Sequence, residues 1–199
     1  MVFLLFLFRR GCAVVASLSA PVSSSSCGVG LPPSVVALVA GARSVAFSGS
    51  RSVVPPVLAS IVACVSPRAF VAVGCASGVD AAVRASVVGC SVFSAASFAA
   101  SSWAGRLALR SAAVVRAGAA RSPALVVVFP SGACPRGLSP SPSVSGCFSG
   151  LGSGSWSSAA FAAGLGAPLL VFSPVGVPSW GFSSLGGGWF LLSPSPSLF

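Results

Sequence analysis

The chain has 199 residues, enough for one domain with a sizeable core plus tails but short for two full domains. It carries 11 basic residues against 1 acidic residue, so its formal charge of +10 reflects missing carboxylates more than an enrichment in basic side chains. Lys, His, Glu, Asn, Gln, Thr and Tyr are absent, which excludes a Ser-His-Asp or Cys-His arrangement within the chain and removes most general acids and bases.

The residue types that remain are almost all ones that the genetic code can write without adenine. Only Met1, Ile61 and Asp80 require that base. Every stop codon contains adenine, so a long open frame of this kind can arise by chance, and a non-functional or decayed adenine-poor reading frame stays open as an alternative. For the same reason the basic charge, which normally indicates nucleic acid or anionic membrane partners, is only a hint here.

The apolar composition does not by itself predict a membrane protein. No run of about 18 apolar residues is present, as a spanning helix requires, and the apolar residues 1–8 are followed at once by Arg9 and Arg10. A membrane-associated N-terminus is the minority alternative. The 7 cysteines form no C-x-x-C pair, so we expect small buried hydrophobes in a reducing compartment, no metal site and no cofactor. The expected location is cytoplasmic, with no membrane partner.

From residue 44 onward, short apolar runs alternate with longer Ala/Val-rich segments across Gly-containing turns, a pattern typical of βα units. Residues 1–42, which mix apolar, Ser-rich and Gly/Pro-rich stretches, are predicted to be a poorly ordered leader. The first predicted strands cover residues 45–48, 69–73 and 90–94, and the helices between them cover residues 57–65 and 79–88.

The second half contains the clearest elements. Residues 103–117 are predicted to form a helix that Gly118 caps, and the apolar run 125–129 reads as a buried parallel strand. A loop is expected at 130–150, a helix at 155–165, a strand at 168–172 and a Ser/Pro/Gly-rich tail at 173–199. Residues 43–172 are thus predicted to be one α/β domain, a Rossmann-like open, mainly parallel sheet flanked by helices, with irregular N- and C-terminal tails.

Two Gly-containing turns each follow a predicted strand and precede a predicted helix. In the first, Gly49 and Ser50 offer backbone N–H groups that suit a phosphate, and Arg51 can add a bidentate contact, although an ordinary βα turn has the same composition. In the second, Gly74 and Gly78 permit close backbone approach, and Asp80 falls in the first helical turn. Asp80 either contacts a ligand or stabilises the start of the helix, pairing with Arg84 four residues later.

The order of these motifs resembles the SLOG superfamily, which includes DNA-processing protein A and the cytokinin-activating phosphoribohydrolases. Gly-Ser-Arg at 49–51 and Gly-Cys-Ala-Ser-Gly-Val-Asp at 74–80 carry the resemblance. Two later stretches agree with it: Trp103-Ala104-Gly105-Arg106 with Arg110, and Gly152-Ser153-Gly154-Ser155-Trp156. The family commonly has threonine where Ser155 stands, and the codon bias favours that replacement.

The resemblance implies a nucleotide pocket at the carboxyl edges of the strands. It would be lined by Gly49, Ser50, Arg51, Gly74, Gly78, Asp80, Gly154 and Ser155, and Arg106 and Arg110, on one helical face, would approach the same anion unless they form a solvated face. The phosphoribohydrolases have a Pro-Gly-Gly-x-Gly-Thr-x-x-Glu pattern, whereas this chain has no Glu, so no catalytic residue is assigned.

We therefore expect non-catalytic binding or sensing of a nucleotide or nucleotide-derived small molecule. The alternatives are a single-stranded DNA-binding accessory factor and a phosphoribohydrolase-like enzyme, and a homo-oligomer stays open. The 4 tryptophans are expected to pack in the core or in loops rather than to stack on bases.

Overall fold

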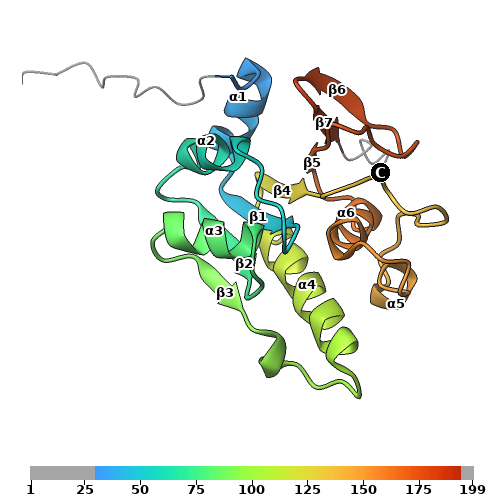
Figure 1. Ribbon diagram of the computed structural model, residues 1–199. Coiled ribbons are helices and arrows are strands. Elements are labelled where there is room, and N and C mark those ends of the chain that lie inside the picture. Colours follow the sequence, from blue (N-terminus) through green and yellow to red (C-terminus); the bar gives the residue numbers. More distant parts are fainter. Residues whose placement is uncertain (1–29, 194–199) are drawn as a thin grey trace, which may run out of the picture.

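The computed structural model describes residues 30–193, in which helices and strands alternate along most of the chain (Figure 1). The helices are α1 (Pro33–Gly41), α2 (Val57–Cys64), α3 (Val79–Ser86), α4 (Trp103–Ala119), α5 (Val144–Cys147) and α6 (Gly154–Gly164), with a 3-10 turn η1 (Ala95–Ser97) before α4. The strands are β1 (Ser44–Gly49), β2 (Phe70–Gly74), β3 (Ser91–Phe93), β4 (Ala124–Phe129), β5 (Leu169–Phe172), β6 (Ser183–Gly186) and β7 (Trp189–Leu192).

These strands form one sheet in the order β3-β2-β1-β4-β5-β7-β6. Neighbouring strands are parallel in the first five positions of this order, β3-β2-β1-β4-β5. Strand β7 lies antiparallel to both of its neighbours, β5 and β6. After β3 the chain crosses over through α4 and enters β4 on the far side of β1, so strand order reverses between β1 and β4. The protein therefore has a Rossmann-like α/β fold with a mainly parallel sheet, which confirms the predicted fold class.

Helices cover both faces of the sheet because successive strand residues point to opposite sides. Val45 and Phe47 of β1 pack with α1, α2 and α3, whereas Ala46 packs with α4 and α6. Figure 1 shows the two groups of helices on either side of the sheet. Valine-rich strands buried on both faces account for the continuous apolar runs in the sequence.

Gly118 lies inside α4, which corrects the prediction that it caps the helix. A Cβ added at Gly118 would lie 2.8 Å from the backbone nitrogen of Ala46 and 2.9 Å from its Cα. Glycine therefore lets α4 approach the backbone of β1, and the helix continues to Ala119 before Ala120 ends it.

Regular structure also occurs in segments predicted to be irregular. Helix α1 lies within the predicted leader 1–42, and its Val35 and Val39 are fully buried. Helix α5 lies within the predicted loop 130–150. Residues 1–29 of that leader lie outside the described residues, as do the last residues, 194–199, of the predicted tail.

The predicted tail contains the hairpin of β6 and β7, which extends the sheet beyond β5. Trp189 of β7 is buried, with its ring centroid 5.8 Å from that of Phe129 and 5.0 Å from that of Phe172. Gly187 and Gly188 form the turn, and both have positive φ, as does Gly186 at the end of β6. The glycines that suggest disorder in the sequence therefore serve a tight connection. The prediction of an irregular C-terminal tail is wrong for this hairpin.

Within residues 30–193, cysteine use differs from the prediction at Cys64. Cys64 is disulfide-bonded, so it is not simply a small buried hydrophobe. The free thiols in the described part of the chain are Cys75, Cys90, Cys134 and Cys147. No helix within residues 30–193 has both the length and the apolar character to span a membrane.

Candidate functional site

A cavity of about 410 Å³ opens at the carboxyl ends of β1 and β4. These strands are neighbours at the point where strand order reverses, so the loops that follow them diverge and leave a crevice. Helix α4 and the first turn of α6 form its sides, and serine and glycine dominate its surface. The lining residues are Ser48, Gly49, Ser50, Arg51, Ser52, Ala76, Asp80, Ala104, Leu107, Ala108, Arg110, Ser111, Ser131, Phe148, Gly150, Gly152, Ser153, Gly154, Ser155 and Ser157.

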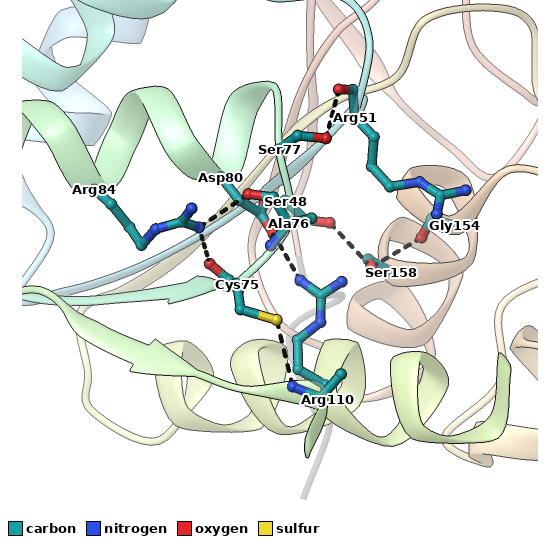
Figure 2. Close-up of polar contacts among 12 residues, drawn as sticks. Ser48, Arg51, Cys75, Ala76, Ser77, Asp80, Arg84, Arg110, Gly154 and Ser158 are labelled. Atoms are coloured by element: carbon teal, nitrogen blue, oxygen red, sulfur yellow. Dashed lines mark hydrogen bonds and ion pairs between the residues drawn. The ribbon is translucent and has the colours of Figure 1, made fainter. Parts of the chain in front are cut away.

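The turn after β1 is fixed by Ser50. Its N–H donates to the Phe129 carbonyl at 2.9 Å, and its hydroxyl accepts the N–H groups of Ser52 at 3.2 Å and Val53 at 3.1 Å. Arg51 follows with an exposed side chain that Figure 2 shows extending toward the start of α6, where Gly154 lies. Its guanidinium forms no ion pair with the chain's one acidic side chain, so the charge of Arg51 is available to a ligand.

Asp80 and Arg110 form a buried ion pair in the cavity wall. Arg110 Nη1 donates to Asp80 Oδ2 at 2.6 Å, and the two residues are 8% and 3% exposed. The carboxylate lies in the first turn of α3, and Figure 2 shows the guanidinium reaching it from α4. Asp80 Oδ2 also accepts the N–H of Ala76 at 3.3 Å. The carboxylate therefore joins α3, the loop before it and α4.

The environment of Asp80 changes its acidity. Burial raises the pKa of Asp80 above its ordinary value of 3.8, and the charge and hydrogen bond of Arg110 oppose that rise, with smaller opposing contributions from the Ala76 N–H and from Arg84. The short contact with the Arg110 guanidinium, 2.6 Å between Nη1 and Oδ2, favours the ionised form of the carboxylate. Arg110 thus offsets only part of the desolvation that the fold imposes on Asp80.

The pKa of Asp80 predicts an unusual dependence of stability on pH. Between 3.8 and the higher folded-state pKa, the folded chain holds more protons than the unfolded chain, so the free energy of unfolding falls as pH rises through that window. Urea denaturation from pH 3 to pH 7 measures this directly. Because the chain has no other acidic side chain, we expect the slope to disappear in Asp80→Asn. A stability that rises with pH across this window would contradict the assignment.

Arg84 does not bond to Asp80, which corrects the predicted pairing within α3. Its Nη1 instead donates to the carbonyls of Gly74 at 2.5 Å and Ala76 at 3.0 Å. These carbonyls lie at the end of β2 and in the loop that follows it, the same loop whose Ala76 N–H donates to Asp80. Arg84 therefore stabilises the loop between β2 and α3 rather than the carboxylate.

Gly74 and Gly78 do not line the cavity, although the sequence resemblance implies that they do. A Cβ at Gly74 would overlap Asp80 Oδ2 and the guanidinium of Arg110, so this glycine makes room for the ion pair. Gly78 has a φ of +66°, and a Cβ there would overlap the backbone of Ser50 and Arg51. Both glycines permit close packing behind the cavity wall.

The first turn of α6 forms the opposite wall. The hydroxyl of Ser153 caps it by accepting the Trp156 N–H at 3.3 Å, and Gly154 and Ser155 follow at the cavity surface. The first N–H groups of a helix have no intrahelical partner and lie at the positive end of the helix dipole. This wall therefore suits an anion or a hydrogen-bond acceptor.

The remaining predicted site residue, Arg106, is half-buried and does not line the cavity. The structure therefore does not bring Arg106 to the cavity that Arg110 lines, and the charge of Arg110 is already engaged by Asp80. The structure brings seven of the predicted residues together at the cavity, namely Gly49, Ser50, Arg51, Asp80, Arg110, Gly154 and Ser155.

Several cavity residues escaped sequence reasoning. The hydroxyl of Ser48 donates to that of Ser158 at 3.1 Å, and Ser158 donates to the Gly154 carbonyl at 3.0 Å, which ties the end of β1 to α6 (Figure 2). In a chain this rich in serine, single serines carry no pattern that would separate them from the rest.

The tryptophans lie mostly where core packing predicts. Trp156 and Trp189 are buried, and Trp156 Nε1 donates to the Gly132 carbonyl at 2.7 Å. Trp180 packs edge-on against Trp156 at 6.1 Å between centroids. Trp103 is the exception, being 59% exposed at the start of α4.

Fold and cavity together define a Rossmann-like α/β protein with a hydroxyl-rich crevice at the point where strand order reverses. No family model matches the chain, and neither the curated proteins nor the solved structures contain a significant match to it. Within the described residues, no group of three or more His, Cys, Asp or Glu side chains is placed to hold a metal ion.

Proposed function

We propose that this protein binds a nucleotide or a nucleotide-derived small molecule without catalysing its conversion. The observation that carries the proposal is the position of the cavity, at the carboxyl ends of β1 and β4 where parallel α/β sheets bind ligands. Its volume of about 410 Å³ lies in the range of small-molecule sites. Arg51 and the first turn of α6 are suited to the phosphate end of such a ligand.

The available side chains favour binding over catalysis. A phosphoribohydrolase-like reaction needs a carboxylate, and Asp80 is the one carboxylate side chain of the chain. Asp80 is already held by Arg110 and by the Ala76 N–H, so it is fixed rather than free to transfer a proton.

The order of motifs along the chain supports a SLOG-like or DNA-processing-protein-A-like module. The turns after β1 and before α6, which carry that resemblance, both line the cavity. Binding of single-stranded DNA is the competing outcome, and a gel-shift assay at low salt tests for it.

Arg51→Ala is expected to weaken nucleotide binding at least about tenfold, because it removes a charged hydrogen-bond donor worth more than about 1.5 kcal/mol. The side chain is exposed, so the fold should tolerate the change. Isothermal titration calorimetry with the four ribonucleoside monophosphates and with dinucleotides measures the effect.

Arg43→Ala is the matched control. Arg43 is also exposed, but it precedes β1 at the opposite edge of the sheet, so its loss should leave affinity unchanged. Equal weakening by both variants would indicate a general effect of charge. No heat of binding from any of these nucleotides, with folded protein, would reject the proposed function.

A further inference from the structure

The buried ion pair leaves one oxygen of Asp80 unused. Both hydrogen bonds of the carboxylate, from Arg110 and from Ala76, go to Oδ2. Oδ1 accepts none from the described residues, and it is not among their buried polar atoms that lack a partner. Asp80 lines the cavity, so Oδ1 is the carboxylate oxygen that remains available to a ligand.

Arg110 likewise has one donor atom that the described residues leave unused. Its Nη1 is bonded to Asp80, and its Nε is buried without a partner, so neither is offered to the cavity. Nη2 has no partner among the described residues and is not enclosed in this way, and Arg110 also lines the cavity. The cavity wall therefore contains one acceptor atom of Asp80 and one donor atom of Arg110 that the described residues leave unbonded, and the bond between the two side chains holds both in place.

This pair of groups is electrically neutral as a unit. A phosphate placed against it would gain from Arg110 but would be repelled by the adjacent carboxylate, and like charges within about 4 to 6 Å disfavour each other. Arg51 has no such carboxylate partner and lines another part of the same cavity. An anion is therefore better placed at Arg51 than at Arg110.

We infer that Asp80 Oδ1 and Arg110 Nη2 recognise a neutral, hydrogen-bond-donating part of the ligand, its sugar hydroxyls or the polar edge of its base, while the phosphate binds at Arg51. The inference rests on the proposed function, and it assigns the neutral part and the phosphate of the ligand to different residues of the cavity. Asp80 is thereby a specificity-determining residue, because its oxygen has to be satisfied by a donor when the ligand excludes water. A ligand without that donor leaves a buried acceptor unpaired.

Asp80 can be observed without interference, because it is the only aspartate in a chain with no glutamate. Protein labelled with ¹³C at the aspartate carboxyl gives one side-chain carboxyl resonance, whose pH titration reports the pKa of Asp80 with and without ligand. The cationic groups around it are Arg110 and Arg84. A ligand donor bonded to Oδ1 lowers the pKa, by about 1 unit, whereas a phosphate beside the carboxylate raises it.

The probes are the ribonucleoside monophosphate that calorimetry shows to bind best, its 2′,3′-dideoxy analogue and inorganic phosphate. We expect the monophosphate to lower the pKa of Asp80 and inorganic phosphate to leave it unchanged. Loss of the effect with the dideoxy analogue assigns the donor to the sugar, and its retention assigns the donor to the base. Arg51→Ala should weaken affinity but preserve the fall in pKa at saturation.

A nucleotide that binds while the pKa of Asp80 stays constant or rises overturns this inference and leaves the proposed function standing. If no nucleotide binds, the proposed function itself fails. The two results are distinguishable because affinity and the Asp80 titration are measured independently.

Discussion

Arg110→Ala is expected to lower the free energy of unfolding by about 3 to 5 kcal/mol, because it leaves the Asp80 carboxylate buried without its partner. Asp80 is 3% exposed and its Oδ2 lies 2.6 Å from Arg110 Nη1, so the guanidinium is the charged partner that compensates the burial of the carboxylate. Urea denaturation at pH 7, monitored by far-UV circular dichroism, measures the change.

Arg106→Ala provides the control on the same helix. Arg106 lies one turn earlier on α4 and is half-buried, so its replacement should change stability by less than about 0.5 kcal/mol. In the double variant Asp80→Asn with Arg110→Ala, the unpaired charge is gone, so we expect less loss than in Arg110→Ala alone. If Arg106→Ala and Arg110→Ala were equally mild, the ion pair would have no structural role.

Gly78→Ala is expected to lower the free energy of unfolding by about 2 to 5 kcal/mol. A φ of +66° costs an L-residue about 1 to 2 kcal/mol, and the overlap of the new Cβ with the backbone of Ser50 and Arg51 adds about 1 to 3 kcal/mol. That backbone is already bonded to this loop, since Val79 N–H donates to the Ser50 carbonyl at 3.0 Å and Ser77 Oγ to the Arg51 carbonyl at 2.9 Å. The substitution should therefore also weaken nucleotide binding.

Gly89→Ala separates the two contributions. Gly89 has a similar φ of +76°, but nothing lies within 4 Å of an added Cβ, so only the backbone strain of about 1 to 2 kcal/mol should appear. Gly89 does not line the cavity, and its variant should bind nucleotide normally. If both glycine variants lost the same stability, the two βα loops would not be in steric contact.

Local patterns in the sequence were sufficient to predict most strands of the sheet and the helices between them. The run of valines before Phe129 is apolar at every position, as a parallel strand buried on both faces requires, and it forms β4. Ser102 accepts the N–H of Gly105 at the start of α4, a cap that the local sequence can encode. The Gly-containing turns that follow the predicted strands indicated a ligand site at the carboxyl edge of the sheet.

The hairpin within the predicted tail 173–199 could not be predicted from local patterns. The hairpin of β6 and β7 contains Ser and Gly at most positions of its first strand, so neither apolar alternation nor β-propensity marks it. It is stabilised instead by pairing of β7 with β5 and by burial of Trp189 against Phe172, contacts between segments that the sequence does not show to be adjacent.

For Asp80, the sequence by itself determined that a lone carboxylate stands in the first turn of a helix after a Gly-containing loop, because short-range spacing sets helix starts. Its partner was decided only by the tertiary structure. Arg84 is the local candidate, but Arg110 takes the bond because the crossover through α4 brings it to the end of β2, where Gly74 leaves space for both groups. Sequence spacing reports neighbours within a helical turn, whereas sheet order decides which distant side chains meet, and here it converts a predicted helix-stabilising carboxylate into part of the cavity wall.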